Sequence, residues 1–348
     1  MSTERTEIEK LGEFGLIDRL TQNFETLNAS TVLSIGDDAA VIDHFGKQTV
    51  VTTDLLIEGV HFDLMYTPLK HLGYKSVVVN LSDIYAMNAQ PTQITMSVAF
   101  SNRFSLEALE EFYDGVAIAC DKYGVDLIGG DTSTSQKGLI ISVTALGEVA
   151  PDQYIKRSTA ESGDLICVSG DLGAAFLGLT LMEREKQIFL ENPQIQPNLE
   201  NEDYIVGRLL RPEARKDIIE LLEKLEIKPT SMMDISDGLS SDVLHLCKQS
   251  ELGCRIYEEK IPINEASKAA AFKFGLDATV CALNGGEDYE LLFTMKQSDY
   301  DKMTMQEEIS VIGYMCDASE GNKLITKGNN LFDITAQGWN AFGKQVND

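Results

Sequence analysis

Residues 48–56 read QTVVTTDLL, and residues 71–87 read HLGYKSVVVNLSDIYAM. The first stretch is rich in β-branched residues and predicts a strand, whereas the apolar spacing of the second predicts a helix. The same kinds of pattern continue on both sides of this pair. They predict helices over 7–24 and 105–124 and strands over 92–100, 125–131 and 138–149. This part of the chain is therefore expected to form an α+β domain.

The segment 150–164, APDQYIKRSTAESGD, interrupts the pattern with polar turn formers and no apolar period. A chain of 348 residues favours about two domains, so we place them at 1–150 and 151–348. In the second domain, Pro212 is expected in the first turn of a helix, where its missing N–H has little effect. The patterns there predict strands over 164–170, 231–236, 254–261, 288–295 and 308–315, helices over 171–185, 211–225, 239–251 and 264–275, and a loop with a short helix over 186–207.

The chain carries 29 Lys and Arg against 55 Asp and Glu, a net charge of −26. Such a charge repels nucleic-acid phosphates and anionic membranes, although divalent cations can still bridge carboxylates to a nucleotide. No apolar run approaches the roughly 18 residues of a membrane span, and residues 1–10 lack the apolar core of a signal peptide. We therefore expect a cytoplasmic protein that binds neither nucleic acid nor membrane, with its six scattered cysteines reduced in the core.

Five short segments place acidic residues beside glycines or at the ends of predicted strands: IGDDAAVI, VTTDLLIEGVHF, NLSDIYAMNAQP, LIGGDTS and DISDGLSSD. Each alone is typical of a turn or a helix cap, and Asp83 is equally explained by a satisfied polar network in the core. However, Asp54, Asp131 and Asp234 each follow or end an apolar strand, where a carboxylate is unfavourable unless it is paired or metal-bound. One hard-cation site would explain them together, and oxygen ligands favour Mg²⁺ over zinc. Hydroxyls that could complete such a site belong to Thr52, Thr53 and Ser236.

Familiar phosphate-binding motifs are missing from the sequence. There is no Walker A loop, no G-x-G-x-x-G and no protein-kinase motif pair. The remaining candidates for phosphate contact are backbone amides at glycines, together with one cation in the interdomain segment. These residues are Gly36, Gly129, Gly130, Gly238 and Arg157.

In chain order, GDDAAV, TTDLLIEGVHF, VNLSDIYAMNAQP, IGGDT, DISDGLSSD and GGEDYELLF resemble the motifs of the thiamine-monophosphate kinase family. That family lies within the aminoimidazole-ribonucleotide-synthetase-like superfamily. The resemblance spans nearly the whole chain and implies two mixed α/β domains of that type. It also implies ATP-dependent phosphorylation of thiamine monophosphate to thiamine diphosphate, in a homodimer whose N-terminal domains pair through their sheets. The N-terminal domain would then bind metal and ATP, and the C-terminal domain would complete the nucleotide and substrate site.

The resemblance also implies roles for individual residues. Positions matching the family's magnesium ligands are Asp38, Thr52, Thr53, Asp54, Asp83, Asp131, Asp234 and Asp237. Positions matching its nucleotide contacts are Tyr113, Gly130, Asp131, Arg157 and Ser236. Positions matching its substrate contacts are His61, Glu287 and Trp339, and the residues expected closest to the chemistry are Asp54, Asp131 and Asp237.

Charge arithmetic agrees with a cluster of several Mg²⁺ ions. Six aspartates, ATP and the substrate phosphate together carry about −12, and two Mg²⁺ would still leave about −8. Several ions would bring the two phosphates together for direct in-line transfer, without a phosphoenzyme. The acceptor oxygen is already ionised near neutral pH, so His61 is expected to orient the substrate rather than act as a base, with a structural role as the alternative.

Two other functions remain open on sequence alone. One is a superfamily enzyme that acts through ATP on an amide or on selenide. The selenide branch is disfavoured because it would carry a reactive cysteine near the N-terminus, whereas the first cysteine here is Cys120. The other is an acidic cation-binding scaffold or dimerisation module without turnover. Release of ADP with and without thiamine monophosphate separates these classes.

Overall fold

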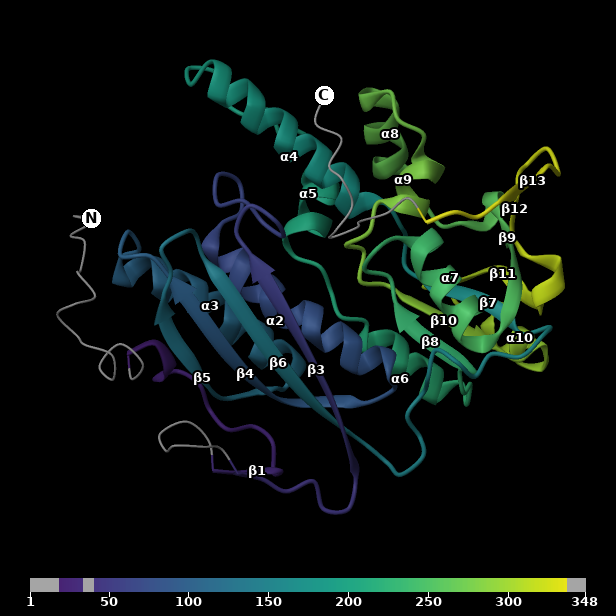
Figure 1. The fold of residues 1–348 in the computed structure, drawn as a ribbon, viewed down its shortest axis with the longest axis horizontal. Coiled ribbons are helices and arrows are strands. Elements are labelled where there is room, and N and C mark those ends of the chain that lie inside the picture. The colour runs from purple at the N-terminus through teal and green to yellow at the C-terminus, as the bar shows by residue number, and fades with distance from the viewer. Residues whose placement is uncertain (1–18, 34–40, 337–348) are drawn as a thin grey trace. The chain divides into compact units, whose positions relative to one another are not determined.

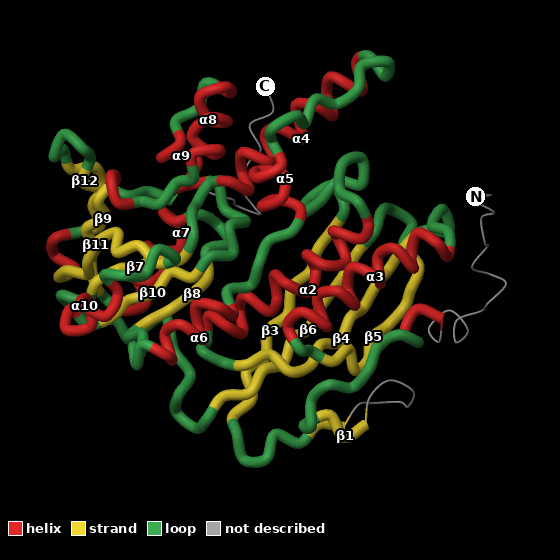
Figure 2. Tube along the Cα trace, turned by 180° about the vertical axis from the view of Figure 1, so that it is seen from behind, coloured by secondary structure: helices red, strands yellow, loops and turns green. Residues whose placement is uncertain are grey.

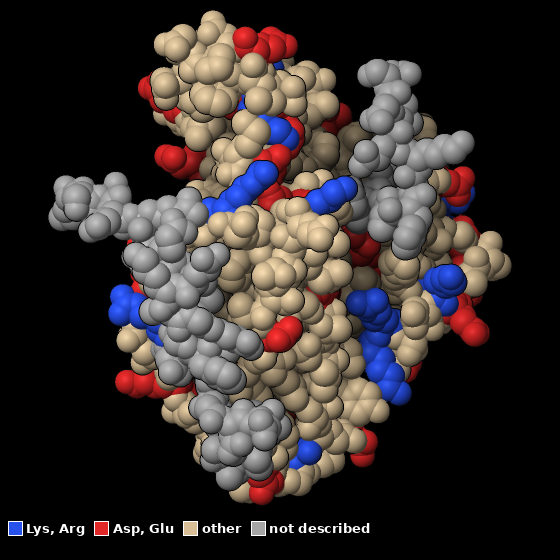
Figure 3. Space-filling view, turned by 60° about the vertical axis from the view of Figure 1, so that its left-hand side comes forward, with Lys and Arg blue, Asp and Glu red and all other residues tan. Residues whose placement is uncertain are grey.

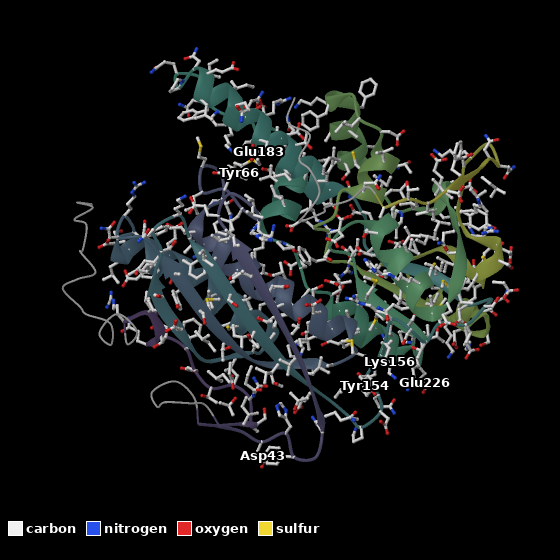
Figure 4. The ribbon with its side chains drawn as sticks, in the orientation of Figure 1. Asp43, Tyr66, Tyr154, Lys156, Glu183 and Glu226 are labelled. Carbon is white, nitrogen blue, oxygen red and sulfur yellow. The ribbon has the colours of Figure 1, made fainter. Side chains whose placement is uncertain are left out.

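The computed structural model describes residues 19–33 and 41–336. The chain divides into two compact units, Met1–Tyr154 and Ile155–Asp348 (Figure 1). Tyr154 and Lys156, on either side of this boundary, are labelled in Figure 4. Most of the helix expected over 7–24 lies outside the described residues. Among the helices that are described, none is long and apolar enough to cross a membrane.

A four-stranded sheet forms the centre of the first unit. Its order is β3-β6-β4-β5, with β4 and β5 parallel and the other neighbours antiparallel. The strands are β3 (Gln48–Ile57), β4 (Gln90–Phe100), β5 (Asp126–Thr134) and β6 (Ile140–Val149), and they confirm the four strands predicted for this region. Two short strands, β1 (Thr31–Leu33) and β2 (Val41–Ile42), pair separately.

Two helices, α2 (Leu69–Ala86) and α3 (Leu106–Tyr123), lie together on one face of this sheet (Figure 2). Helix α2 packs against β3, β4 and β6. The helices approach closely through two glycines: a Cβ at Gly73 would lie 1.9 Å from the Phe112 carbonyl oxygen, and one at Gly115 would lie 1.9 Å from that of Lys70. Only residues without a side chain therefore fit at this crossing.

The second unit contains a seven-stranded sheet of order β13-β12-β9-β11-β7-β10-β8. Among the described strands of this sheet, only β9 and β12 pair in parallel. The buried core on one side of the sheet includes Val243 and Leu246 of helix α7 (Leu239–Ser250) together with Ile166 and Leu292. The strands are β7 (Leu165–Ser169), β8 (Ser231–Asp234), β9 (Leu252–Tyr257), β10 (Leu291–Met295), β11 (Ile309–Asp317), β12 (Asn322–Ile325) and β13 (Leu331–Asp333).

A second apolar cluster joins helices α4, α5, α8 and α9 through residues such as Leu177, Ile205 and Ala271. All six cysteines of the chain are free and buried, as predicted. The helices of this unit are α4 (Ala174–Glu191), α5 (Asp203–Leu210), α6 (Lys216–Lys224), α7 (Leu239–Ser250), α8 (Glu265–Phe274), α9 (Ala278–Asn284) and α10 (Tyr300–Met303).

The second unit also corrects several predicted boundaries. The helix expected from residue 211 begins at Lys216, so Pro212 precedes it, and residues 211–215 instead bring Arg215 to the carboxylate of Glu290. The strand expected from residue 288 begins at Leu291, because Tyr289 has a φ of 52°, which strand geometry excludes. Helix α4 extends to Glu191, through residues predicted as loop. Helix α9 and strands β12 and β13 were not predicted.

Candidate functional site

In the first unit, β3 and α2 bring together three of the predicted metal ligands. The Thr52 hydroxyl donates to Oδ2 of Asp83 at 2.7 Å, and the backbone N–H of Asp54 donates to Oδ1 of Asn80 at 3.0 Å. Successive residues of a strand point to opposite faces, so Thr52 and Asp54 share the face that packs against α2. Thr52, Asp54 and Asp83 are half-buried and supply only oxygen ligands, as a hard cation requires.

Thr53 points to the other face of the sheet. Its hydroxyl donates to the Val143 carbonyl at 3.0 Å and accepts from the Thr144 hydroxyl at 3.1 Å. The Thr53 side chain therefore takes part in the pairing of β3 with β6. It does not lie beside Thr52 and Asp54.

His61 lies in the turn that follows β3. Its Nδ1 accepts the backbone N–H of Ile57 at 3.1 Å. A nitrogen that accepts a hydrogen bond carries no proton, so in this arrangement the proton of a neutral ring is on Nε2. The turn thus fixes the orientation of an exposed imidazole near the end of the strand that carries Asp54.

Asp131 and Gly130 lie on β5, at the opposite edge of the sheet from β3. Asp131 is exposed and pairs in register with Ser97. Strands β6 and β4 separate β5 from β3, a distance of about 14 Å at the usual strand spacing. Within one chain, the sheet therefore does not place Asp131 next to Asp54. A Cβ at Gly130 would lie 1.8 Å from the Met96 carbonyl oxygen, so strand pairing alone requires a glycine there.

Tyr113, predicted to contact the nucleotide, belongs to an aromatic cluster on α3. Its ring packs edge-on against Phe112 and Phe24, with centroid distances of 5.6 and 6.5 Å. Burial raises the pKa of its hydroxyl to about 12. This packing is sufficient to explain the residue structurally.

An acidic cluster in the second unit surrounds the loop between β8 and α7. Asp234 ends β8 and is buried, and Oδ2 of Asp242 on α7 accepts the backbone N–H of Asp237 at 3.3 Å. Burial, together with the charges of Asp234 and Asp237 and against the opposing charge of Arg157, raises the pKa of Asp242 to about 8. Burial also raises the pKa of Asp237, and Glu287 adds to this effect. A cation placed here would relieve the repulsion between these carboxylates.

The loop 285–290 adds Glu287 to this cluster. Its backbone N–H donates to the Ser236 carbonyl at 2.8 Å, and its Oε1 accepts the Tyr289 hydroxyl at 3.2 Å. Glu287 and Arg157 both influence the pKa of Asp237, so the three charges lie within electrostatic reach of one another. The second unit therefore brings Arg157, Asp234, Ser236, Asp237 and Glu287 near one another. That these residues bind metal, nucleotide or substrate stays a prediction.

Two predicted site residues, Asp38 and Trp339, lie outside the described residues. Among the residues that are described, no group of three or more His, Cys, Asp or Glu is arranged to hold a metal ion within the chain as it stands. The sequence patterns gave no role to Asn80, and they placed Asp242 in the acidic segment DISDGLSSD without making it a metal ligand. The available signals were an asparagine one helical turn before Asp83 and a third aspartate in DISDGLSSD.

Comparison with known proteins shows which family this chain belongs to. Residues 36–149 match the model for the N-terminal domain of AIR synthase related proteins, and residues 161–321 match the model for the C-terminal domain. The thiamine-monophosphate kinase of Aquifex aeolicus is 34% identical over 335 residues, covering 96% of this chain and 99% of that protein. This chain belongs to the thiamine-monophosphate kinase family.

Solved structures agree with the family assignment. The structure of AaThiL complexed with AMPPCP and TMP has a TM-score of 0.74 and 32% identity, covering 98% of this chain and 100% of that one. The thiamine-monophosphate kinase of Stenotrophomonas maltophilia K279a has a TM-score of 0.77 and 33% identity, covering 93% and 98%. The predicted fold class, two mixed α+β domains of this family's type, is thereby confirmed.

Proposed function

We propose that this chain transfers the γ-phosphate of ATP to thiamine monophosphate, giving thiamine diphosphate and ADP. The observation that carries the proposal is the near-complete coverage of relatives that bear this name, one of which is solved with AMPPCP, an ATP analogue, and TMP. The acidic clusters of both units supply the carboxylates that a metal-dependent phosphoryl transfer requires.

We propose that several Mg²⁺ ions bind these clusters during turnover. The donor set fits, because the ligands are oxygens and the carboxylates of the second unit repel one another without a cation. Bound Mg²⁺ would neutralise charge on the transferring phosphoryl group and on ADP. The residues that would hold it are Asp38, Thr52, Thr53, Asp54, Asp83, Asp131, Asp234 and Asp237.

The remaining residues would bind and orient the two substrates for direct in-line transfer. Arg157 supplies positive charge near Asp237, suited to nucleotide phosphates, and Gly130 and Ser236 supply backbone groups. His61, fixed by Ile57, and Glu287, fixed by Ser236, would orient thiamine monophosphate. We propose that the indole of Trp339 binds the thiazolium cation and that Tyr113 contacts the nucleotide. Asp54, Asp131 and Asp237 are assigned the positions closest to the transferred group.

We further propose a homodimer that pairs through the sheets of the first unit. Val51 and Leu55 on β3 are apolar yet 59% and 50% exposed, and a sheet with exposed apolar residues is stabilised by a partner. Figure 3 shows one face of the molecule with a broad area in which charged side chains are sparse. Asp54 and Asp131 lie on opposite edges of one sheet, and a second copy that supplies one of them would bring both carboxylates to the same group of ions.

A cytoplasmic location is also proposed. Six free, buried thiols fit a reducing compartment, where disulfides rarely form. Location in cells can be tested by fractionation, with a periplasmic or secreted position contradicting the proposal.

Release of ADP tests the proposed activity. With ATP and Mg²⁺, ADP should form at a rate that depends on added thiamine monophosphate and should stop on chelation with EDTA. Turnover that is independent of thiamine monophosphate would assign the chain to another reaction. Turnover that persists in EDTA would remove the metal from the proposal.

A further inference from the structure

The loop that carries Glu287 has an unfavourable backbone. Gly286, Glu287 and Tyr289 all have positive φ, at 69°, 61° and 52°. Residues with a side chain, such as Glu287 and Tyr289, rarely adopt such angles. Such a conformation persists only where surrounding contacts impose it. The position of Glu287 therefore depends on whatever holds this loop.

The main chain of the loop follows the segment after β8. Glu287 N–H donates to the Ser236 carbonyl at 2.8 Å, Tyr289 N–H donates to the Ile235 carbonyl at 2.9 Å, and Ile235 N–H donates to the Glu290 carbonyl at 2.8 Å. One side of the loop is therefore held by main-chain hydrogen bonds to residues 235 and 236.

Arg208, on α5, fastens the other side of the loop. Its Nη1 donates to Oε1 of the buried Glu290 at 2.7 Å, and its Nη2 donates to the main-chain carbonyls of Asp288 at 3.2 Å and Asp171 at 3.1 Å. One guanidinium thus joins the loop, the start of β10 and the turn after β7. Oδ2 of Asp288 joins the same turn, because it accepts the Gly173 N–H at 2.9 Å.

Comparison with Arg215 separates the effect of a positive charge beside Glu290 from the effect of the hydrogen bonds that Arg208 makes to the main chain. It also donates to Glu290, at the other carboxylate oxygen, and is likewise largely buried. Its other hydrogen bonds go to the side chain of Asp217, at 2.9 and 2.8 Å. Both arginines therefore neutralise Glu290, but within the described residues only Arg208 also bonds to the loop's main chain.

We propose that Arg208 is a positioning residue that holds the strained loop so that Glu287 meets the thiamine end of the substrate. This inference rests on the proposed function, because Glu287 acts there as a substrate contact. The lysine of Arg208→Lys keeps the positive charge beside Glu290 but cannot bond to two carbonyls and a carboxylate from one planar group. Arg215→Lys is the matched control.

Steady-state kinetics test the proposal. R208K should raise KM for thiamine monophosphate by on the order of ten- to a hundredfold, with a much smaller change in KM for ATP, whereas R215K should leave both nearly unchanged. In an E287Q background, R208K should add little further increase, because the residue it positions has already been altered. Equal KM effects of R208K and R215K, or fully additive effects with E287Q, would overturn the proposal.

Hydrogen–deuterium exchange provides a readout that does not require activity. The amides of Glu287 and Tyr289 should exchange faster in R208K than in R215K and wild type. If wild type does not turn over thiamine monophosphate but exchange follows this pattern, the proposed function fails and the positioning role stands. Unchanged exchange in R208K would refute positioning even in an active enzyme. If R208K does not fold, the double variant R208Q/E290Q can replace it in this comparison, because it removes Arg208 and its buried partner together while Arg215 keeps its bonds to Asp217.

Discussion

Asp288 is buried beside like charges. One of its oxygens accepts the Gly173 N–H, while Oδ1 has no hydrogen-bond partner among the described residues, and the same holds for Oδ1 of Asp171. The pKa of Asp288 is raised from 3.8 to about 7, mainly by burial and also by the charges of Glu290 and Asp171, while Arg208 opposes the rise. The folded protein therefore binds a proton here that the unfolded chain releases at lower pH.

This raised pKa fixes the sign of a pH effect. The stabilising contribution of Asp288 is fully present below its ordinary value of 3.8 and is lost as pH rises through about 7. Asp288→Asn removes the titration, so the stability of wild type relative to the variant should fall between pH 4 and pH 8. Urea unfolding at a series of pH values measures this difference, with the exposed Asp114→Asn as control. Parallel curves for wild type and D288N would show that Asp288 titrates normally.

Residue patterns identified candidate site residues but not how the fold arranges them. Asp54 and Asp83 could be found because carboxylates beside apolar segments need partners, and α2 supplies Asp83 to the strand face that carries Asp54 and Thr52. The strand's period of two separates Thr53 from Thr52, although both had been grouped as one pair of hydroxyls. The role of Arg208 depends on contacts far apart in sequence, and no local motif carries it.

Helices and strands whose ends carry clear sequence signals, such as capping residues, were predicted with nearly correct bounds. The helix expected over 105–124 is α3, Leu106–Tyr123, because the Ser105 hydroxyl accepts the Ala108 N–H and Gly124 ends the helix with a φ of 70°. In contrast, β10 starts later than predicted because tertiary contacts impose positive φ on Tyr289. Strands β12 and β13 have four and three residues, too few for an alternating pattern to be recognised.

The crossing of α2 and α3 gives a prediction about stability. Gly115→Ala would place a methyl group 1.9 Å from the Lys70 carbonyl oxygen, and neither backbone can move without repacking the helices. We expect the free energy of unfolding to fall by about 1–3 kcal/mol, despite the better helix propensity of alanine. Urea unfolding checks this, and Gly129→Ala, where a Cβ would meet nothing within 4 Å, serves as control. Similar values for both variants would mean that the helices tolerate wider spacing.

At the scale of the whole molecule, the separation of Asp54 and Asp131 predicts complementation between subunits. Asp54→Asn and Asp131→Asn should each be nearly inactive as pure homodimers. If one site takes Asp54 from one protomer and Asp131 from its partner, a mixed dimer keeps one intact site. An equal mixture after subunit exchange should then recover about a quarter of wild-type activity.

Co-expression of the two variants, each with a different affinity tag, provides the mixed dimer, and sedimentation confirms that it is a dimer. No recovery of activity in a confirmed mixed dimer would mean that each chain builds its site alone. A chain that sediments as a monomer of 38.4 kDa would contradict the dimer itself.

Transfer of a phosphoryl group from ATP to thiamine monophosphate is distinguished from other reactions of ATP by the fate of the γ-phosphate. The protein is incubated with γ-labelled ATP, Mg²⁺ and thiamine monophosphate, quenched rapidly, and separated into protein, nucleotide, thiamine and inorganic phosphate fractions. We predict one label in thiamine diphosphate for each ADP formed, and none on the protein when the acceptor is omitted. Label that appears only in inorganic phosphate, or that remains on the denatured protein and is then chased into product, would contradict direct transfer to thiamine monophosphate.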